Sequence, residues 1–411
     1  MRRIARYQTG LALLCGVIGG LVALDRSAIG FLGPYIVADL KLSNAQLGLA
    51  ASAVSLTWGL ASYVVARLAD GAGRTKAWLL AAVIAFSMVS AATGLAVGFV
   101  TLLVARLVLG AAEGPVVVLT LASTIRASDD DRRGLNLGVN GFVTFLIGGA
   151  LAPMLLVALA TAVGWRGAFF LTGVPGLFAA LAGALWLRPD RPRPSAALSP
   201  ASGLPLGLSD LLRTRNLPLC LAAAPLLVGS GGIAGVFIPL YLVNVRHFSP
   251  AVMGQLMGTM GAALTVSMFA APALSDRFGR KPIAVLASLT ALIPLGCLLW
   301  TGPVIGLAAF FAAGGLAIGA LAVLMSSIPS DSVDPRIQAS AIGLVSGAAE
   351  ILGGFGAPVL AGLAADRWGL SAPLIMIIVC TGVAGVIVLG LKETAPRRTG
   401  RLTRLEPVPN T

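Results

Sequence analysis

Charged residues are scarce in this chain of 411 residues. Asp, Glu, Lys and Arg together make up 11% of it, whereas hydrophobic residues make up 57%. About a quarter of the residues of a typical soluble domain are charged. The scarcity of charge therefore argues against a soluble globular protein and predicts a protein that crosses a membrane several times.

Cysteine and histidine are also rare. The four cysteines, Cys15, Cys220, Cys297 and Cys380, all fall in apolar runs, and their spacing fits neither a metal site nor a disulfide framework. We interpret them as small packing residues. The single histidine, His247, falls in a predicted loop. Without a nucleophile–base pair, a metal cluster or a phosphate-binding loop, the sequence predicts no enzyme, no metal and no cofactor.

Long apolar runs are what the sequence has in abundance. A bilayer core needs about 20 residues of helix, and twelve runs come close to or exceed that length. The first run is too long and too charged for a cleavable signal peptide. We therefore predict an all-α membrane protein with spans near residues 9–34, 45–66, 77–97, 99–124, 135–161, 167–187, 217–243, 251–274, 283–301, 303–328, 338–363 and 371–391.

The net charge of +13 follows the predicted topology. If the N-terminus is cytoplasmic, nearly all Lys and Arg outside the spans lie on the cytoplasmic side. Only Lys41, Arg166, Arg246 and Arg367 fall in loops on the outer side. This bias predicts that both termini are cytoplasmic. The basic excess therefore reflects topology and does not indicate a nucleic-acid partner.

The chain divides into two halves. Residues 188–216 contain the run RPDRPRPSAALSPASG, which is too polar and too rich in proline to span a membrane. We predict a bundle of six helices at 1–187, a cytoplasmic linker at 188–216, and a second bundle with a cytoplasmic tail at 217–411. RLADGAGR after span 2 recurs as ALSDRFGRK after span 8. Such a repeat is typical of transporters whose halves rock about a central site.

Five ionisable residues lie inside predicted spans: Asp25, Arg26, Arg106, Glu113 and Glu350. Placing a charge in hydrocarbon costs about 2.5–3.5 kcal/mol on an insertion scale, so such residues usually face a partner or an aqueous cavity. The rest of each span is almost free of charge. These five residues therefore predict the position of the functional site.

The two loop elements resemble the loop motif G-x-L-A-D-R-x-G-R-K of the major facilitator superfamily. GWRGAFF, which starts at Gly164, resembles the segment that opens the sixth helix in that superfamily. The resemblance covers residues 8–391 and implies twelve transmembrane helices in two pseudo-symmetric bundles. The first loop element departs from the motif at Ala66, Gly71 and Thr75, which weakens the inner gate that the resemblance implies.

Two further elements narrow the resemblance. ALDRSAIG places Asp25 and Arg26 on the first helix, and ARLVLGAAEG places Arg106 and Glu113 on the fourth. Together with FIPLYLVNVRHFSPAVMGQL near span 7, they resemble the anion:cation symporter branch, which carries sugar acids and other organic carboxylates. In that branch the matching acids couple proton entry to substrate uptake. The resemblance thus implies a proton-coupling role for Asp25 and Glu113.

The spacing of the charges supports a site for a carboxylate. Arg106 and Glu113 are seven residues apart, so they share one helical face about 10 Å apart along the axis. Counting from the outer ends of the spans puts Arg106 about 10 Å deep and Arg26 about 12 Å deep. If spans 1 and 4 line one cavity, both guanidiniums can bind a single carboxylate. Their planar fork suits bidentate binding.

The buried acids allow two interpretations. Burial and a nearby arginine act in opposite directions on the proton affinity of a carboxylate, so Asp25 and Glu113 are candidate proton carriers. Alternatively, Asp25 with Arg106, or Arg26 with Glu113, forms a static ion pair that holds the N-terminal half together. Buried pairs are poor stabilisers, and we favour the functional interpretation.

Three more residues are candidates for substrate binding. Glu350, in SGAAEILGG, is a third proton site, a ligand for a substrate hydroxyl or ammonium, or a protonated acid bonded to a neighbouring helix. Trp58 either stacks on substrate or packs. Asn140 either contacts substrate or bonds to another helix, together with Thr144 one turn away.

The loop motifs predict gate residues rather than substrate ligands. A carboxylate at the end of one helix can accept from the N-terminus of another helix across the interface, where the helix dipole favours negative charge. By resemblance, Asp70 latches against span 11, and Asp276 does the same at span 5, near Arg133. The predicted gate residues are Asp70, Arg74, Asp276, Arg277 and Arg280.

Together these observations predict a proton-coupled importer of a small organic anion, such as a sugar acid or an aromatic acid. It would be a monomer in the inner membrane of a bacterium and work by rocker-switch alternating access. Its expected partners are the organic anion, protons and the lipid bilayer. The alternatives are a proton-driven exporter of drugs or metabolites and a membrane sensor that binds ligand without carrying it.

Overall fold

The computed structural model describes residues 2–72, 75–129, 131–187, 214–333 and 337–395. Within these ranges the side chains of a few residues, Asp70 among them, lie outside the description. The described chain is helical almost throughout and contains no strand. The predicted all-α fold is confirmed, whereas most of the predicted linker at 188–216 lies outside the described residues and the domain boundaries there stay a prediction.

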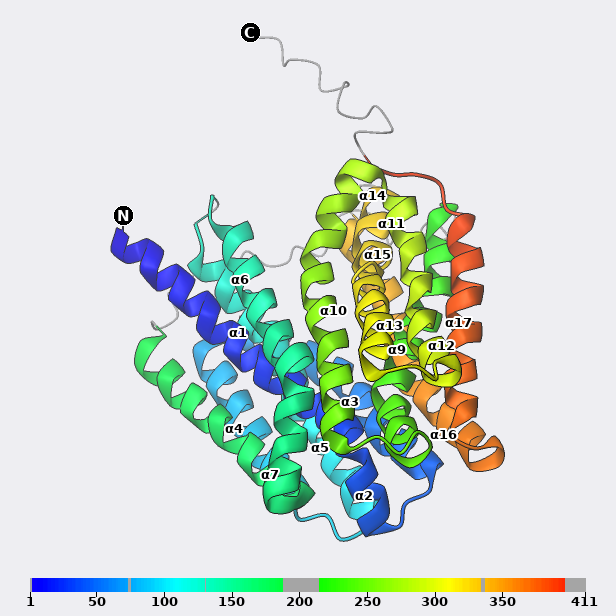
Figure 1. Cartoon of the computed structure of the whole chain (residues 1–411). Coiled ribbons are helices and arrows are strands. Elements are labelled where there is room, and N and C mark those ends of the chain that lie inside the picture. Colours follow the sequence, from blue (N-terminus) through cyan, green and yellow to red (C-terminus); the bar gives the residue numbers. More distant parts are fainter. Residues whose placement is uncertain (1, 73–74, 130, 188–213, 334–336, 396–411) are drawn as a thin grey trace.

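The helices before residue 188, here the N-terminal group, pass back and forth through the molecule (Figure 1). α3 packs against α5, α4 against α7, and α1 against α6. In chain order the group consists of α1 (Arg2–Phe31), α2 (Gly33–Leu40), α3 (Asn44–Ala72), α4 (Thr75–Thr93), α5 (Phe99–Ala127), α6 (Arg133–Phe145), the π-helix η1 (Leu146–Leu151) and α7 (Ala152–Trp186).

The helices after residue 213, here the C-terminal group, include three short irregular segments within longer helical runs. α9 packs against α17 and η5, and α10 packs against α13. In chain order they are α9 (Asn216–Asn244), α10 (Pro250–Phe278), α11 (Arg280–Leu286), the 3-10 helix η2 (Ala287–Ala291), α12 (Leu292–Leu299), α13 (Val304–Ile318), the π-helix η3 (Val323–Ser327), α14 (Ile328–Asp331), α15 (Gln338–Ala348), the π-helix η5 (Ala349–Gly356), α16 (Ala357–Trp368) and α17 (Ser371–Leu389).

Eleven helical stretches of the described chain are long and apolar enough to cross a membrane. One of them, Arg133–Trp186, has 54 residues, and a straight helix of that length would measure about 81 Å. It turns at Gly164, whose φ of 74° and ψ of 166° suit glycine. The two arms on either side of this turn correspond to the predicted spans 5 and 6. The eleven stretches therefore account for all twelve predicted spans.

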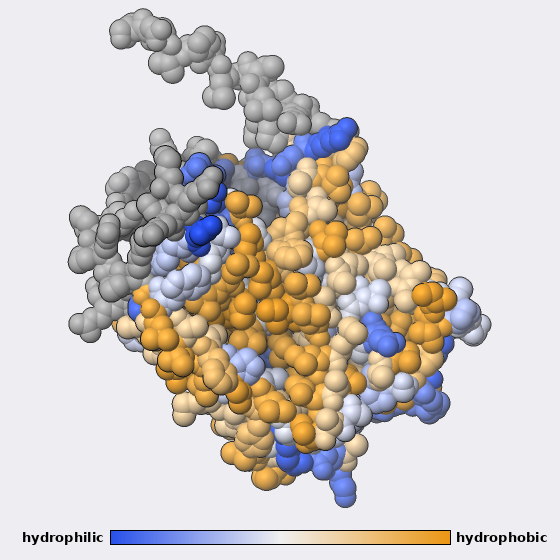
Figure 2. Space-filling view, turned by 60° about the vertical axis from the view of Figure 1, so that its left-hand side comes forward, coloured by the Kyte–Doolittle hydropathy of each residue, from blue (hydrophilic) through white to orange (hydrophobic). Residues whose placement is uncertain are grey.

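The surface agrees with a bilayer environment. Large apolar side chains are exposed on many helices, as at Leu185 (80%), Val386 (71%) and Phe178 (68%). Most of the face in Figure 2 is orange, and blue residues gather at its upper and lower margins. Apolar surface of this extent is rare on soluble monomers, and a membrane removes it from water.

The two groups meet at one end of the molecule and part at the other. We call the end that carries α2 the α2 face, and the end that carries the described chain ends, near Arg6 and Leu391, the termini face. One core cluster contains residues of both groups, such as Ile29 and Phe237. Nearer the termini face, two separate clusters each belong to a single group. In Figure 1 the N-terminal group accordingly leans away from α10 toward the termini face.

Backbone contacts close the α2 face tightly. A Cβ on Gly30 would lie 2.0 Å from the carbonyl oxygen of Gly235, and one on Gly48 would lie 2.3 Å from that of Pro358. Glycine is needed at these positions because no side chain fits between the helices. Asp366 at the end of α16 adds a polar contact, since its carboxylate accepts from the backbone N–H groups of residues 44 (2.8 Å) and 45 (3.0 Å). It thus caps α3 across the interface between the groups.

We expect Asp366→Asn to loosen the α2 face. An amide accepts through one oxygen only and carries no charge toward the N-terminus of α3. The loss is about 1 kcal/mol after allowance for solvent screening. Spin labels at Lys41 and Trp368, in a background without the native cysteines, should then show a second, longer distance in double electron–electron resonance.

Asp39→Asn is the matched control for this prediction. Asp39 lies on the same face but bonds to Trp165 and Arg166 within the N-terminal group. Its substitution should leave the distance between the labels unchanged. An unchanged distance distribution in Asp366→Asn would show that the carboxylate does not hold the two groups together.

Candidate functional site

The two groups share one ion pair in the interior of the molecule. Arg26 on α1 donates through Nη2 to Oε2 of Glu350 on η5, at 3.2 Å. The same nitrogen donates to the hydroxyl of Ser55 on α3, at 2.8 Å. Both side chains of the pair are 34% exposed, so solvent reaches them. Residues from three distant parts of the sequence therefore meet at a solvent-accessible point between the groups.

Trp58 completes this accessible cluster. The guanidinium carbon of Arg26 lies 5.6 Å from the centre of the Trp58 ring, within the range of a cation–π interaction. Nε1 of Trp58 is buried without a hydrogen-bond partner among the described residues. The ring therefore supports the guanidinium, while its N–H group points into the protein and not toward solvent. The sequence left open whether Trp58 stacks on substrate or packs within the protein. In this conformation its ring contacts Arg26.

Close approach of α3 and α5 positions Ser55 and Trp58. A Cβ on Gly110 would lie 2.3 Å from the carbonyl oxygen of Val54, and one on Gly114 would lie 2.3 Å from that of Trp58. The two glycines, four residues apart, thus let α3 lie directly against α5. Gly110 and Gly114 thus serve helix packing rather than substrate binding.

Behind Arg26 lies a second, fully buried cluster. Arg106 is 0% exposed and Asp25 is 1% exposed, and Nη1 of Arg106 lies 3.8 Å from Oδ2 of Asp25. Ser90 on α4 donates to the other oxygen of Asp25, and its hydroxyl also lies 3.2 Å from that of Thr172 on α7. Asp25 is therefore tied to three helices of the N-terminal group.

Arg26 and Arg106 lie close together, since Nη2 of Arg106 donates to the backbone oxygen of Arg26 at 3.4 Å. They do not face the same space. Arg26 is accessible between the groups, whereas Arg106 is enclosed within the N-terminal group. In this conformation only Arg26 can meet a ligand. Carboxylate binding by Arg106 stays a prediction for another state of the protein.

Glu113 is the least satisfied residue of the buried cluster. It is 0% exposed, and neither of its carboxylate oxygens has a hydrogen-bond partner among the described residues. It interacts electrostatically with Asp25 and Arg106. Nε and Nη1 of Arg106 and Oδ2 of Asp25 also lack hydrogen bonds. Buried polar groups are nearly always paired, so this cluster is one that a proton or a change of conformation can rearrange.

Asn140 has an interhelical bond rather than a place in the accessible cluster. Its amide donates to Thr124 on α5 at 2.9 Å, and the hydroxyl of Thr144 donates to its backbone oxygen at 2.9 Å. The sequence left open whether Asn140 contacts substrate or bonds to another helix, and the structure shows the bond to another helix. A role for Asn140 in substrate binding stays a prediction.

Of the predicted gate residues, Asp276, Arg277 and Arg280 lie at the termini face. Arg74 and the side chain of Asp70 fall outside the described residues. Asp276 forms an ion pair with Arg280 (2.7 Å), which also binds Asp331 on α14 (3.0 Å). Arg277 lies over the ring of Phe278. These contacts stay within the C-terminal group, and the predicted latches across the interface stay a prediction for a state in which the termini face is closed.

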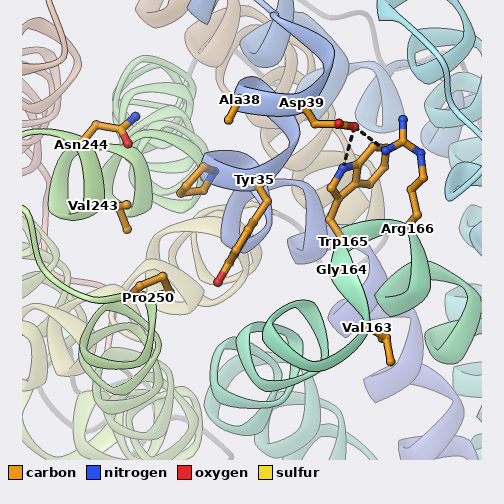
Figure 3. A pocket seen from close by; sticks show the side chains of 11 residues that line it. Tyr35, Ala38, Asp39, Val163, Gly164, Trp165, Arg166, Val243, Asn244 and Pro250 are labelled. Carbon is orange, nitrogen blue, oxygen red and sulfur yellow. Dashed lines mark hydrogen bonds and ion pairs between the residues drawn. The ribbon is translucent and has the colours of Figure 1, made fainter.

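The GWRGAFF segment borders a cavity of about 680 Å³ at the α2 face (Figure 3). Asp39 on α2 accepts from Arg166 and from Nε1 of Trp165. These hydrogen bonds hold the pKa of Asp39 below its usual range. Arg166 also lies over the ring of Trp165 and donates to a backbone oxygen. Because these groups already pair with one another, the segment ties α2 to α7 and leaves no free charge for an anion.

Sequence reasoning missed Ser55, Ser90 and Asp366. The two serines are ordinary small residues in apolar helices, and only their contacts with Arg26 and Asp25 distinguish them. Asp366 follows the pattern that predicted the gate, an acid at the end of a helix, but on the other face of the molecule. The run AADRW contains that acid, so a search of both faces for this pattern would have found it.

Comparison with known proteins agrees with this architecture. The sequence pattern that defines the Major Facilitator Superfamily matches residues 15–311 and 229–409. The chain belongs to this superfamily. It is a multi-pass membrane transporter rather than an enzyme, and the predicted superfamily and branch are confirmed.

Solved structures and curated relatives give the same picture. A bacterial homologue of the human lysosomal transporter Spinster superposes with a TM-score of 0.78 at 18% identity, covering 98% of this chain and 99% of that one. The hexuronate transporter of Bacillus subtilis is 29% identical over 390 residues, 87% of each chain. The gallate transporter of Pseudomonas putida is 32% identical over 212 residues, 51% of this chain and 46% of that one.

We expect Arg106→Met to destabilise the protein strongly. It leaves the buried carboxylates of Asp25 and Glu113 without a counter-charge, which typically costs about 3–5 kcal/mol. The triple variant that adds Asp25→Asn and Glu113→Gln should recover most of the melting temperature in detergent. If Arg106→Met alone melts like the wild type, the buried cluster does not contribute to stability as an ion pair.

Proposed function

We propose that this protein is a proton-coupled secondary transporter that imports a small organic anion by alternating access. The observation that carries the proposal is a solvent-accessible arginine, Arg26, between the two helical groups, with a buried acid cluster directly behind it. The relatives carry hexuronate and gallate, which are organic acids. Protons are the coupling ion. The protein lies in the inner membrane of a bacterium, with both termini on the cytoplasmic side.

Arg26 is the primary ligand for the substrate carboxylate. Among the described residues, its Nε and Nη1 make no hydrogen bond, since both bonds of the side chain use Nη2. Three of the five N–H donors of the planar guanidinium therefore remain for a ligand. Trp58 supplies an aromatic face at the same place. This combination suits a carboxylate attached to a sugar or an aromatic ring. Arg106 and Asn140 are predicted to join the ligand in other states.

Asp25 and Glu113 are the proposed proton carriers. With Arg106 they make a buried cluster of two negative charges and one positive charge when all three are ionised. A single bound proton makes the cluster neutral, which low-polarity surroundings favour. Arg106 donates to the backbone of Arg26, so a proton that rearranges the buried cluster also acts on the residue that binds substrate.

The arrangement of the two groups supports the transport cycle. They share a core at the α2 face and have separate cores toward the termini face. With cytoplasmic termini, this is a state open to the cytoplasm. The opposite state requires Asp366 to leave the N-terminus of α3 and the gate residues Asp70 and Asp276 to engage across the termini face.

Substrate-driven proton uptake in proteoliposomes tests the proposal. Glucuronate, gluconate and 4-hydroxybenzoate are screened for alkalinisation of the outer medium. We expect at least one acid to drive proton uptake with the wild type and about tenfold less with Arg26→Ala, because a charge-assisted hydrogen bond is lost. Glu113→Gln should keep substrate exchange and lose the coupled proton movement.

Asp129→Asn serves as the control, since Asp129 is exposed beyond the end of α5 and lies outside the site. Proton release driven by cationic or apolar compounds, with no response to acids, would contradict import and indicate the exporter. Full proton uptake in Glu113→Gln would remove Glu113 from the coupling mechanism while leaving anion transport intact.

A further inference from the structure

The Arg26–Glu350 pair has features of an exchangeable contact. Glu350 reaches Arg26 through one oxygen and one nitrogen, at 3.2 Å, whereas strong arginine–carboxylate pairs use two parallel hydrogen bonds. About one third of each side chain is exposed, so water screens the attraction between them. A ligand carboxylate that approaches Arg26 can therefore compete with Glu350 for the guanidinium.

The local backbone holds the Glu350 carboxylate in this place. Glu350 lies on the π-helix η5, an irregular form of helix that is frequent at functional sites. Its Oε2 lies over Gly354 of the same helix, where a Cβ would come within 2.6 Å of that oxygen and 3.4 Å of the Ser55 hydroxyl. The absence of a side chain at residue 354 thus makes room for the carboxylate beside Arg26.

Charge balance decides what ligand such a site favours. In the accessible cluster, Arg26 contributes one positive charge and Glu350 one negative charge. A simple carboxylate that takes Arg26 leaves Glu350 without its hydrogen-bond donor and next to a second negative charge. A ligand that also carries an O–H or N–H donor beside its carboxylate can take Arg26 and satisfy Glu350 at the same time.

We propose that Glu350 is a specificity-determining residue that occupies Arg26 in the empty site and selects carboxylates with an adjacent hydroxyl or ammonium donor. The inference rests on the proposed function, since it concerns the same site. The ligand enters between a residue of the N-terminal group and one of the C-terminal group. Monocarboxylates that carry no such donor, whether aliphatic or aromatic, are rejected because they displace Glu350 without replacing its donor.

Equilibrium binding to the purified protein in detergent tests the inference without any transport step. The probes are three six-carbon monocarboxylates: gluconate with hydroxyls, 2-aminohexanoate with an ammonium, and hexanoate with neither. We expect the wild type to bind gluconate or 2-aminohexanoate at least about tenfold more tightly than hexanoate, the size of one charge-assisted hydrogen bond. Which of the two binds more tightly identifies the donor.

Glu350→Gln should reduce this preference to about threefold or less, since an amide no longer competes as an anion for Arg26 and accepts more weakly. Hexanoate should gain affinity in this variant and the donor-bearing probe should lose it. Ser55→Ala is the matched variant, because Ser55 bonds to Arg26 on its other side. It should weaken all probes together and leave their ratio unchanged.

Equal affinities of the wild type for the three probes, or binding of none of them, would overturn the inference. So would a Glu350→Gln variant in which all three affinities fall together, since Glu350 would then only support the fold. The proteoliposome assay of proton uptake, with glucuronate, gluconate and 4-hydroxybenzoate, tests the proposed function separately. An Arg26-dependent acid that drives proton uptake, with selectivity unaffected by Glu350→Gln, would uphold that function and reject this inference.

Discussion

The architecture of the site depends on one buried ion pair, Asp25 with Arg106. An ion pair of this kind is a poor stabiliser against an apolar alternative, because desolvation offsets much of its attraction. Here it joins α1 to α5, and Ser90 adds α4. Successive side chains on an α-helix point about 100° apart. With Asp25 directed into the N-terminal group, Arg26 therefore lies on a neighbouring face of α1, where it meets α3 and Glu350 of the C-terminal group.

Asp25 and Arg26, which are adjacent on α1, link the buried cluster to the accessible cluster. In the proposed mechanism the buried cluster binds a proton and the accessible cluster binds an anion. Arg106 contacts both, since it lies against Asp25 and donates to the backbone oxygen of Arg26. The accessible cluster also bridges the two groups through Glu350. A change of charge on either side therefore alters a contact that the groups must break when they move.

Most of the fold could be predicted from the sequence because a bilayer leaves few alternatives to apolar helices of about 20 residues. The five intramembrane charges were also the basis of the predicted site, because a charge in hydrocarbon needs a partner or water, and the structure gathers them into two adjacent clusters. The sequence did not decide which charges form pairs. It offered Asp25 with Arg106 as one possibility, which the structure shows, but it did not suggest Arg26 with Glu350. The pairing depends on the rotation of each helix, which Gly110 and Gly114 set through backbone contact with α3. Arg26 and Arg106 lie close together, yet face different spaces.

Asp366 shows why the predicted gate was incomplete. The sequence pattern placed acids at the termini face, where the two loop motifs repeat, but a rocking transporter needs contacts that hold each of its closed ends. Asp366 provides one at the α2 face with the same physics, a carboxylate on the N-terminus of a helix from the other group. Such a contact is reversible, because water can replace it at an exposed helix end. In the proposed cycle the close backbone contacts at Gly30 and Gly48 separate in the same movement, so the polar cap and the glycine contacts would open and close together.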